Sequence, residues 1–326
     1  MPLPGVSVAD LDARTLKRFR DRAAKSQRLA EDALNEVDAS LIDKLRLTDG
    51  RYLKRAAVLL FHPDPERFFT GSFVKIGYFE SETDLRYHDE IHGDLFTQVS
   101  KTMDLLLTKY LKAMISYEGI QRVETFPVPR STLREAVLNA IIHRDYAVGA
   151  PIQIRVYADR LQIWNPGHLP EDWSRNKLLS PHASRPFNPD VANAFFRAGE
   201  IEAWGRGIQR VFQACREAGM PEPQLQVESG EFWFGFPFSA DYLANVGGQA
   251  AGKTTQKTTQ KTNQKRILKV LRESPTASRR AIAEQLDDIT ENGVKYHLDR
   301  LKEAGLIRRV GPDRGGRWEV IGDVDA

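Results

Sequence analysis

The chain has 326 residues, of which 41% are hydrophobic and 28% are charged, an ordinary balance for a globular protein. It contains no long apolar run, and acidic residues are mixed with basic ones near its start, so neither a membrane span nor a secretory signal is expected. The single cysteine, Cys215, excludes an internal disulfide, which is typical of a cytoplasmic protein.

Charge is distributed unevenly along the chain. From Lys253 to the end there are 16 basic and 11 acidic residues, a net charge of +5, which leaves −2 for the preceding residues because the whole chain carries +3. A surface that binds a polyanion is therefore expected in the C-terminal part.

The first third of the chain alternates helical and extended patterns. Residues 8–47 are predicted to be helical, with Asp12 or Thr15 as a start signal. The short apolar runs at 56–61 and 73–79 predict strands, and residues 95–111 have the periodicity of an amphipathic helix.

A predicted helix in the middle of the chain carries Glu135, Asn139 and His143. At about 100° per residue these polar side chains form a stripe roughly 80° wide, and apolar residues occupy most of the remaining circumference. A helix that is apolar on most sides is buried, and buried polar groups without partners cost roughly 1–3 kcal/mol each. The stripe therefore faces a ligand, a metal, or an internal hydrogen-bond network that holds the helix to the sheet.

Alternating patterns follow this helix. Residues 152–157 and 161–164 predict a hairpin, and residues 232–238 predict a closing strand. The combination predicts an α+β fold in which a sheet and helices form a two-layer sandwich. Cys215 lies on an apolar stripe of a predicted helix at 208–217, which indicates a small core residue.

Three further blocks stand out, namely Asn165-Pro-Gly167, Ser184-Arg-Pro-Phe-Asn-Pro189 and Trp204-Gly-Arg-Gly-Ile208. In the last block Gly205, Arg206 and Gly207 precede a predicted helix, so backbone amides at its positive end could approach a phosphate. An ordinary helix-entry turn is the alternative interpretation.

Together with Glu135-x-x-x-Asn139-Ala140-x-x-His143-Arg-Asp-Tyr146, these blocks resemble the GHKL-type ATPase domain of gyrase, Hsp90, histidine kinase and MutL relatives. The version they resemble is attached to Schlafen-AlbA-like bacterial transcriptional regulators, which are often labelled RecG-like. The segment before residue 125 resembles only the C-terminal end of the Schlafen-AlbA-like module and lacks its acidic segment, so a nuclease role is not expected.

The resemblance implies that Asn139 coordinates Mg²⁺ through its amide oxygen, that Mg²⁺ bridges the phosphates of ATP, and that Glu135 polarises the attacking water. His143 belongs to the same stripe without an assigned role. The remaining residues implied in nucleotide binding lie in the later blocks: Asn165, Gly167, Ser184, Arg185, Gly205, Arg206 and Gly207. Many relatives read adenine with an Asp-x-Gly-x-Gly box, and the reduced turn at 165–167 leaves guanine selectivity and a degenerate pocket open.

We expect four parts in the chain. A remnant of the Schlafen-AlbA-like module covers residues 1–124 and the ATP-binding domain covers 125–246. A flexible linker at 247–264, which contains a basic tetrapeptide repeated three times, precedes a winged helix at 265–326.

The predicted winged helix has three helices, the second capped by Ser278 and the third by Thr290, followed by a basic hairpin. Its third helix offers candidate base contacts, and its hairpin offers arginines for phosphates. The predicted DNA-binding residues are Asn292, Lys295, Tyr296, Arg308, Arg309, Arg314 and Arg317. A protein-interaction module is the alternative.

These patterns predict a cytoplasmic transcriptional regulator that binds ATP and double-stranded DNA, with no membrane partner. A homodimer is a further candidate assembly, because DNA readers with this motif often dimerise. An ATPase that acts on DNA and a nucleotide-independent scaffold remain alternatives, and whether ATP is hydrolysed is left open. No P-loop is present, so a RecG-type helicase motor is not expected.

Overall fold

The structure is a computed structural model, and it describes residues 2–118, 121–180, 182–202, 204–228, 230–250, 264–286, 291–311 and 316–322. The chain divides into two compact units, residues 1–243 and 244–326. Each unit is described by itself below. No helix in the described ranges is both long and apolar enough to cross a membrane.

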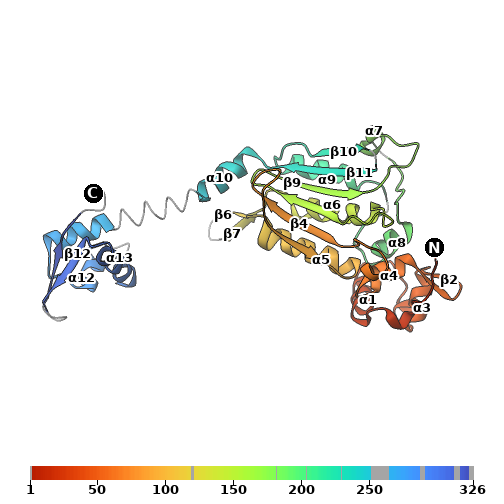
Figure 1. Ribbon diagram of the computed structural model, residues 1–326, viewed down its shortest axis with the longest axis horizontal. Helices are drawn as coiled ribbons and strands as arrows, with labels where there is room; N and C mark the ends of the chain where they lie inside the picture. Colours follow the sequence, from red (N-terminus) through yellow and green to blue (C-terminus); the bar gives the residue numbers. More distant parts are fainter. Residues whose placement is uncertain are drawn as a thin grey trace. The chain divides into compact units, whose positions relative to one another are not determined.

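A six-stranded sheet in the order β10-β11-β9-β8-β4-β5 forms the centre of the first unit (Figure 1). All neighbouring strands are antiparallel except β4 and β8, which run parallel. The strands are β4 (Val74–Phe79), β5 (Leu85–Ile91), β8 (Ile152–Val156), β9 (Arg160–Pro166), β10 (Gln224–Glu228) and β11 (Glu231–Pro237). The predicted strand at 73–79, the hairpin and the closing strand are confirmed.

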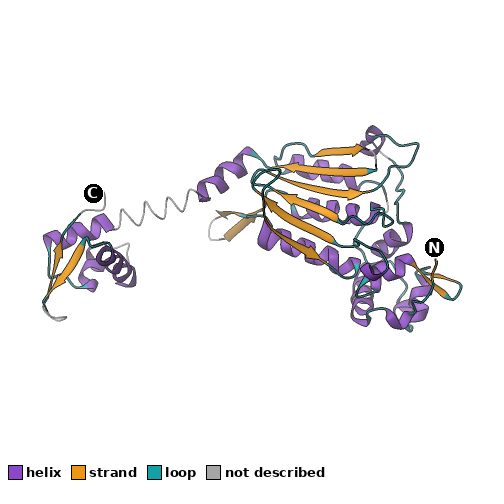
Figure 2. Ribbon diagram, viewed as in Figure 1, coloured by secondary structure: helices purple, strands orange, loops and turns teal. Residues whose placement is uncertain are grey.

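Helices cover one face of this sheet and leave the other face open (Figure 2). The covering layer contains α5 (Leu95–Leu105), α6 (Arg130–His143) and α9 (Gly207–Glu217). A π-helical turn, η3 (Leu106–Tyr110), extends α5 over most of the range predicted for this helix. The predicted α+β two-layer arrangement is confirmed, and Cys215 on α9 is fully buried in it.

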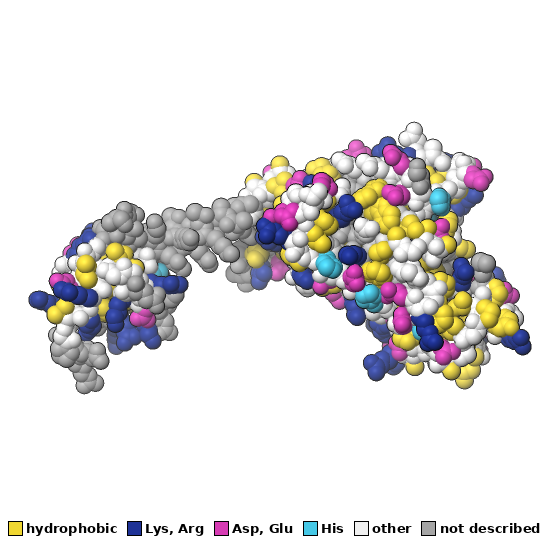
Figure 3. All heavy atoms as spheres, in the orientation of Figure 1, with side chains coloured by type: hydrophobic (Ala, Val, Ile, Leu, Met, Phe, Trp, Pro, Cys, Tyr) yellow, Lys and Arg dark blue, Asp and Glu magenta, His cyan; other side chains and the backbone are white. Residues whose placement is uncertain are grey.

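The open face of the sheet carries aromatic side chains at alternate positions. Arg155 lies over the rings of Phe79 and Trp233, at 5.9 and 5.0 Å from their centroids. In Figure 3 hydrophobic side chains are visible across this face, with charged groups among and around them.

Short helices make up most of the N-terminal part of the first unit. They are η1 (Val8–Asp10), α1 (Ala13–Ser26), α2 (Glu31–Asn35), α3 (Asp38–Lys44), α4 (Arg55–Phe61) and η2 (Pro65–Arg67), with a small sheet of β1 (Pro2–Leu3), β3 (Tyr52–Lys54) and β2 (Thr48–Asp49). Asp12 caps α1, because its carboxylate accepts from the backbone N–H groups of Arg14 and Thr15 at 3.3 and 3.2 Å. The helical prediction for residues 8–47 is thus confirmed in outline.

The prediction of a strand at 56–61 is wrong, because these residues form α4. Every residue from Ala56 to Phe61 is buried, so the run has no polar face to reveal a helical period. Short apolar runs of this kind cannot be assigned to helix or strand from periodicity alone.

Four phenylalanines join the N-terminal helices to the rest of the first unit. Phe19 on α1 contacts Phe61 on α4 and Phe96 on α5, with ring centroids 5.6 and 5.9 Å apart. Phe96 also lies 4.8 Å from Phe195 on α8 (Pro189–Arg197). All four rings are fully buried.

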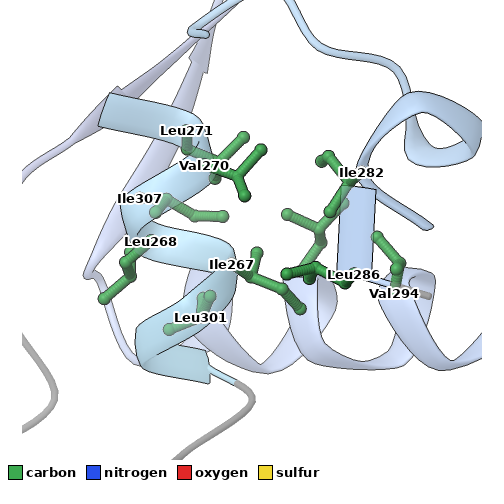
Figure 4. Close-up of a cluster of buried hydrophobic side chains, with 10 residues drawn as sticks. Ile267, Leu268, Val270, Leu271, Ile282, Leu286, Val294, Leu301 and Ile307 are labelled. Carbon is green, nitrogen blue, oxygen red and sulfur yellow. The ribbon is translucent and has the colours of Figure 1, made fainter. Parts of the chain in front are cut away.

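The described residues of the second unit form helices and a hairpin around an apolar core (Figure 4). Residues 264–273 are helical and are followed by α12 (Arg279–Leu286), α13 (Glu291–Glu303), β12 (Ile307–Val310) and β13 (Arg317–Val320). Ser278 caps α12 through a 3.2 Å hydrogen bond from the N–H of Ala281. The predicted helices and hairpin are confirmed, and the proposed cap Thr290 lies outside the described residues.

Helix α10 (Ala240–Ala250) spans the boundary between the units at residue 243 and includes the first four residues of the predicted linker. Most of that linker lies outside the described residues. The proposed division at residue 124 remains a prediction.

We expect Phe96→Ala to lower the free energy of unfolding of the first unit by about 3–5 kcal/mol, because it removes a ring packed against three others. Urea-induced unfolding would measure the change. Val37→Ala is the control: this side chain is 72% exposed, and its loss should cost less than about 0.5 kcal/mol. Equal effects of the two substitutions would contradict the role of the aromatic cluster.

Candidate functional site

A cavity of about 470 Å³ opens between α6, β9 and the segments on either side of α8. Its volume lies in the range of roughly 300–1,000 Å³ that small-molecule sites occupy. It is lined by all the residues predicted for nucleotide binding except Gly167 and Arg206, namely Glu135, Asn139, His143, Asn165, Ser184, Arg185, Gly205 and Gly207.

The polar stripe of α6 forms one wall of the cavity. Glu135, Asn139 and His143 are each partly buried and all line it, whereas the apolar residues around the rest of the helix are buried. The amide Nδ2 of Asn139 donates to Oε1 of Glu135 at 3.3 Å. This orientation leaves Oδ1 of Asn139 as an acceptor for a further group.

The N-terminus of α9 meets the stripe at Gly207. A Cβ atom at this position would collide with Oε1 of Glu135 and would lie 3.4 Å from Nδ2 of Asn139. Glycine therefore allows the first turn of α9 to approach both side chains. A helix N-terminus favours negative charge, so the carboxylate and a phosphate would both be attracted to this end of the cavity.

Burial raises the pKa of the Glu135 carboxyl above its ordinary value, although the hydrogen bond from Asn139 opposes the shift. The charges of Arg134 and Arg210 also oppose the shift, and the Arg134 guanidinium itself donates to the backbone oxygen of Glu200 at 2.8 Å and pairs with that residue's carboxylate. A carboxyl group with a raised pKa in a cavity is a candidate proton acceptor.

His143 is neutral at physiological pH, because burial and the nearby His182 lower its pKa to about 4. The end of α6 lies close to the turn after β9. A Cβ atom on Gly167 in this turn would lie only 2.7 Å from the carbonyl oxygen of His143. Gly167 thus allows close packing behind the cavity wall instead of lining the cavity.

Asn165 lies at the end of β9, opposite Phe232 of β11, and both side chains line the cavity. The Asn165 side chain is buried, and its Nδ2 contacts the oxygen of Pro166 at 3.3 Å. The amide and the ring therefore stand together at the end of the cavity near His143, which suits a flat polar ring such as a nucleobase.

The loop that begins at residue 168 covers the cavity and includes α7 (Arg175–Leu179). Arg185 on this loop donates to both carboxylate oxygens of Asp172 at 2.8 Å, and this pair keeps the pKa of Asp172 low. Arg185 also lies over the ring of Trp173, which contacts His182. The predicted phosphate ligand Arg185 is therefore engaged within the loop itself.

Gly205 lies in the segment between α8 and α9 and packs against the covering loop. Its φ of +65° favours glycine, and a Cβ there would strike the carbonyl oxygen of His182 and lie 3.0 Å from the backbone nitrogen of Ser184. Arg206 occupies the N-cap position of α9 and does not line the cavity.

Other motif residues hold the cavity wall in place. Asn188 donates from Nδ2 to the oxygens of Ile142 and Arg144 at 2.8 and 2.7 Å, which satisfies carbonyls at the end of α6. Arg144 is buried and donates to the oxygen of Ala150 at 2.8 Å, while the hydroxyl of Tyr146 donates back to Ile141 at 3.0 Å.

Sequence reasoning missed several lining residues, which come from the covering loop and from β11: His168, Trp173, His182, Phe232 and Phe234. The loop residues have no periodic spacing that could reveal them. The two phenylalanines lie in the predicted strand, and strand alternation could have placed them on one face.

The second unit presents a basic hairpin. Arg308 on β12 pairs with Glu319 on β13 at 2.6 Å, and Arg309 lies 4.9 Å from the ring centroid of Trp318. Arg317 on β13 and Lys295 on α13 are exposed. Arg314 and the side chains of Asn292 and Tyr296 lie outside what the structure describes.

Two segments of the chain match family models. Residues 149–236 match the model described as putative ATP-dependent DNA helicase recG C-terminal (HATPase_c_4), and residues 263–310 match one described as helix-turn-helix domain. The chain therefore contains an ATPase-like domain and a C-terminal helix-turn-helix domain. The first match begins after α6 and includes β8 to β11.

Among solved structures, the DIP2311 protein from Corynebacterium diphtheriae has a similar fold, with a TM-score of 0.61 and 19% sequence identity. The alignment covers 98% of this chain and 63% of that protein, so the chain spans less than two thirds of its length. Identity this low supports the fold alone. No curated protein matches the chain significantly.

The ATPase-like domain implies a nucleotide, and the cavity residues fit a nucleotide with Mg²⁺. Among the described residues no three His, Cys, Asp or Glu side chains converge on one point. Mg²⁺ commonly takes few protein ligands and completes its shell with phosphates and water. Because Nδ2 of Asn139 donates to Glu135, its Oδ1 is left to accept, and this oxygen is a suitable single ligand.

Replacing Glu135 by glutamine should stabilise the protein near neutral pH. The raised pKa means that the folded state binds the proton more tightly than the unfolded state, so ionisation costs stability as pH rises from about 4.3, the ordinary value for glutamate. Glutamine removes this cost and can still accept from Asn139. The advantage of Glu135→Gln should therefore shrink as pH falls toward 4.

Denaturant unfolding at several pH values measures this difference. Asp172→Asn provides a control of opposite sign, because its lowered pKa stabilises the protein above the ordinary aspartate value and that contribution is lost on acidification. A Glu135→Gln variant that is less stable than the wild type at pH 7 would contradict the assignment.

Proposed function

We propose that the protein is a transcriptional regulator that binds ATP with Mg²⁺ in the α6–β9 cavity and double-stranded DNA through its helix-turn-helix domain. The observation that carries the proposal is the meeting of Asn139 and Glu135 with the N-terminus of α9 in one cavity. The same chain holds a helix-turn-helix domain, which gives a nucleotide-dependent protein a means to contact DNA.

The geometry supports a particular orientation of the nucleotide. Asn165 and Phe232 stand at the end of the cavity near Gly167, where a base would find an amide partner and an aromatic ring. Asn139 and Gly207 stand where phosphates would meet backbone N–H groups and an amide oxygen. Bound Mg²⁺ would neutralise phosphate charge and orient the phosphates.

A second candidate function is an ATPase that acts on DNA. It is favoured by the Glu135 carboxyl, whose raised pKa and position at the start of α9 suit a group that accepts a proton from water. A nucleotide-independent scaffold is the third alternative, and it rests on the reduced adenine turn at 165–167.

The proposed DNA surface combines the exposed Lys295 with the arginines of the hairpin. Arg317 is exposed, whereas the guanidinium of Arg308 forms an ion pair with Glu319. We also propose a cytoplasmic location and retain the resemblance of residues 1–124 to the end of a Schlafen-AlbA-like module.

Isothermal titration with ATP tests the nucleotide site. Asn139→Ala should raise the dissociation constant for Mg²⁺-ATP at least about tenfold, because a metal ligand is lost. With EDTA present, the variant and the wild type should bind ATP equally weakly. Glu135→Gln should retain Mg²⁺-ATP binding. If the wild type hydrolyses ATP, this variant should release phosphate more slowly than the wild type. Gln213→Ala, an exposed change on α9, is the control.

Undiminished Mg²⁺-ATP binding by Asn139→Ala would contradict the metal site. A wild-type protein that binds no nucleotide at all would favour the scaffold. Steady phosphate release that DNA stimulates and that Glu135→Gln abolishes would favour the ATPase.

Glu319→Gln should strengthen binding to duplex DNA and steepen its salt dependence, because it frees Arg308 and removes a negative charge from the hairpin. Each additional phosphate contact changes the log–log slope by about −0.9. Arg317→Ala should weaken binding and flatten the slope. Fluorescence anisotropy at several salt concentrations would measure both.

Glu273→Gln is the matched control, because it makes the same change in charge at an exposed site on the helix at 264–273. Equal gains from both glutamine variants would mean that net charge alone matters and that the hairpin is not the DNA surface.

A further inference from the structure

A two-stranded ribbon stands outside the six-stranded sheet. It consists of β6 (Met114–Glu118) and β7 (Gln121–Thr125), which pair antiparallel with each other and form a separate sheet (Figure 1). No side chain described in either strand is buried, and Ile115 is 40% exposed. An isolated two-stranded ribbon is marginally stable in water, and within the described part of the chain no third strand pairs with this one.

The outer edge of β7 is suited to strand pairing. Every second residue of a strand in a two-stranded ribbon directs its N–H and C=O groups away from the partner, and these unpaired groups are a template for another strand. The edge strand β5 of the main sheet is a weaker candidate, because it already belongs to a six-stranded sheet and needs no further strand for support.

The order of the charged residues along β7 favours a second copy of β7 as its partner strand. Arg122 and Glu124 lie on the same face on either side of Val123, and they pair with each other at 2.7 Å while 55% and 48% exposed. If a second β7 is laid antiparallel with the two Val123 residues opposite, each Arg122 lies opposite a Glu124. The sequence is therefore complementary to itself in this register.

We propose that β7 pairs with β7 of a second copy of the chain, about a two-fold axis at Val123. The two ribbons then form one four-stranded sheet in the order β6-β7-β7-β6. Two Arg122–Glu124 cross-strand pairs and one Val123–Val123 pair hold its centre, and such pairs favour a strand register. The contact is isologous, so it closes as a dimer and does not grow into a fibre. The inference does not depend on the binding of nucleotide or DNA.

Charge reversal tests the interface in the full-length protein. Arg122→Glu places glutamate opposite glutamate twice, and Glu124→Arg places arginine opposite arginine twice, so each variant should dimerise at least about tenfold more weakly than the wild type. The double variant R122E/E124R restores opposite charges and should dimerise like the wild type. Sedimentation velocity over a concentration series would measure the dissociation constants.

Mixing the single variants gives the sharpest result. An Arg122→Glu chain and a Glu124→Arg chain are complementary at both pairs, so an equimolar mixture should form dimers although neither variant does so alone. Lys17→Glu, a charge reversal at an exposed position of α1, should leave the wild-type dissociation constant unchanged.

Disulfide trapping tests the register. Opposite residues of an antiparallel pair have Cα atoms about 4.5–5.5 Å apart, within the range that a disulfide spans. Val123→Cys should therefore crosslink into a dimer under oxidation. Gln121→Cys alone should not, because Gln121 would face Thr125 of the other copy. The only natural cysteine is buried and should give little background.

Three outcomes would overturn the proposal. The wild type could remain monomeric up to its solubility limit, the single charge variants could dimerise as tightly as the wild type, or the mixture of single variants could fail to dimerise. Crosslinking of Gln121→Cys at the rate of Val123→Cys would overturn the proposed register.

Discussion

The structure of the first unit depends on the burial of α6. This helix contacts α5, α8, α9 and β9, and its apolar residues fill the space between them. The stripe of Glu135, Asn139 and His143 is only partly buried, and it forms a polar wall of the cavity. The chain after the helix is then held by the side chains of Arg144, Tyr146 and Asn188, which donate hydrogen bonds to backbone carbonyl oxygens.

A second constraint links the N-terminal helices to the same region. The carboxylate of Glu200 pairs with Arg22 of α1 and with Arg134 of α6, and its side chain is only 13% exposed. Arg28 donates to the oxygen of Ile201, which lines the cavity, at 2.6 Å. Partly buried ion pairs of this kind are costly to break one partner at a time. The first helix therefore helps to position the cavity wall, although it contributes no lining residue.

The sequence allowed β8, β9 and β11, the helix at 208–217 and the helix-turn-helix to be predicted, because each carries a clear period or cap. It failed at 56–61, where burial on all sides removes the period. The stripe of α6 was predictable because three polar residues break an otherwise apolar pattern. The engagement of Arg185 with Asp172 and the contribution of His182 were not predictable, since both depend on how a non-periodic loop folds over the cavity.

The strand order has a practical consequence for dividing the chain. In the sheet, β4 pairs with β8 and β5 pairs with β4, so the two strands within residues 74–91 cover the edge that β8 would otherwise expose. A fragment that starts at residue 125 would leave β8 as an edge strand, with Ile152, Ile154 and Val156 next to unpaired backbone groups. Apolar edge strands recruit other chains and aggregate. An expression fragment that ends near Leu243 keeps the whole sheet, whereas one that begins at residue 125 is expected to be insoluble.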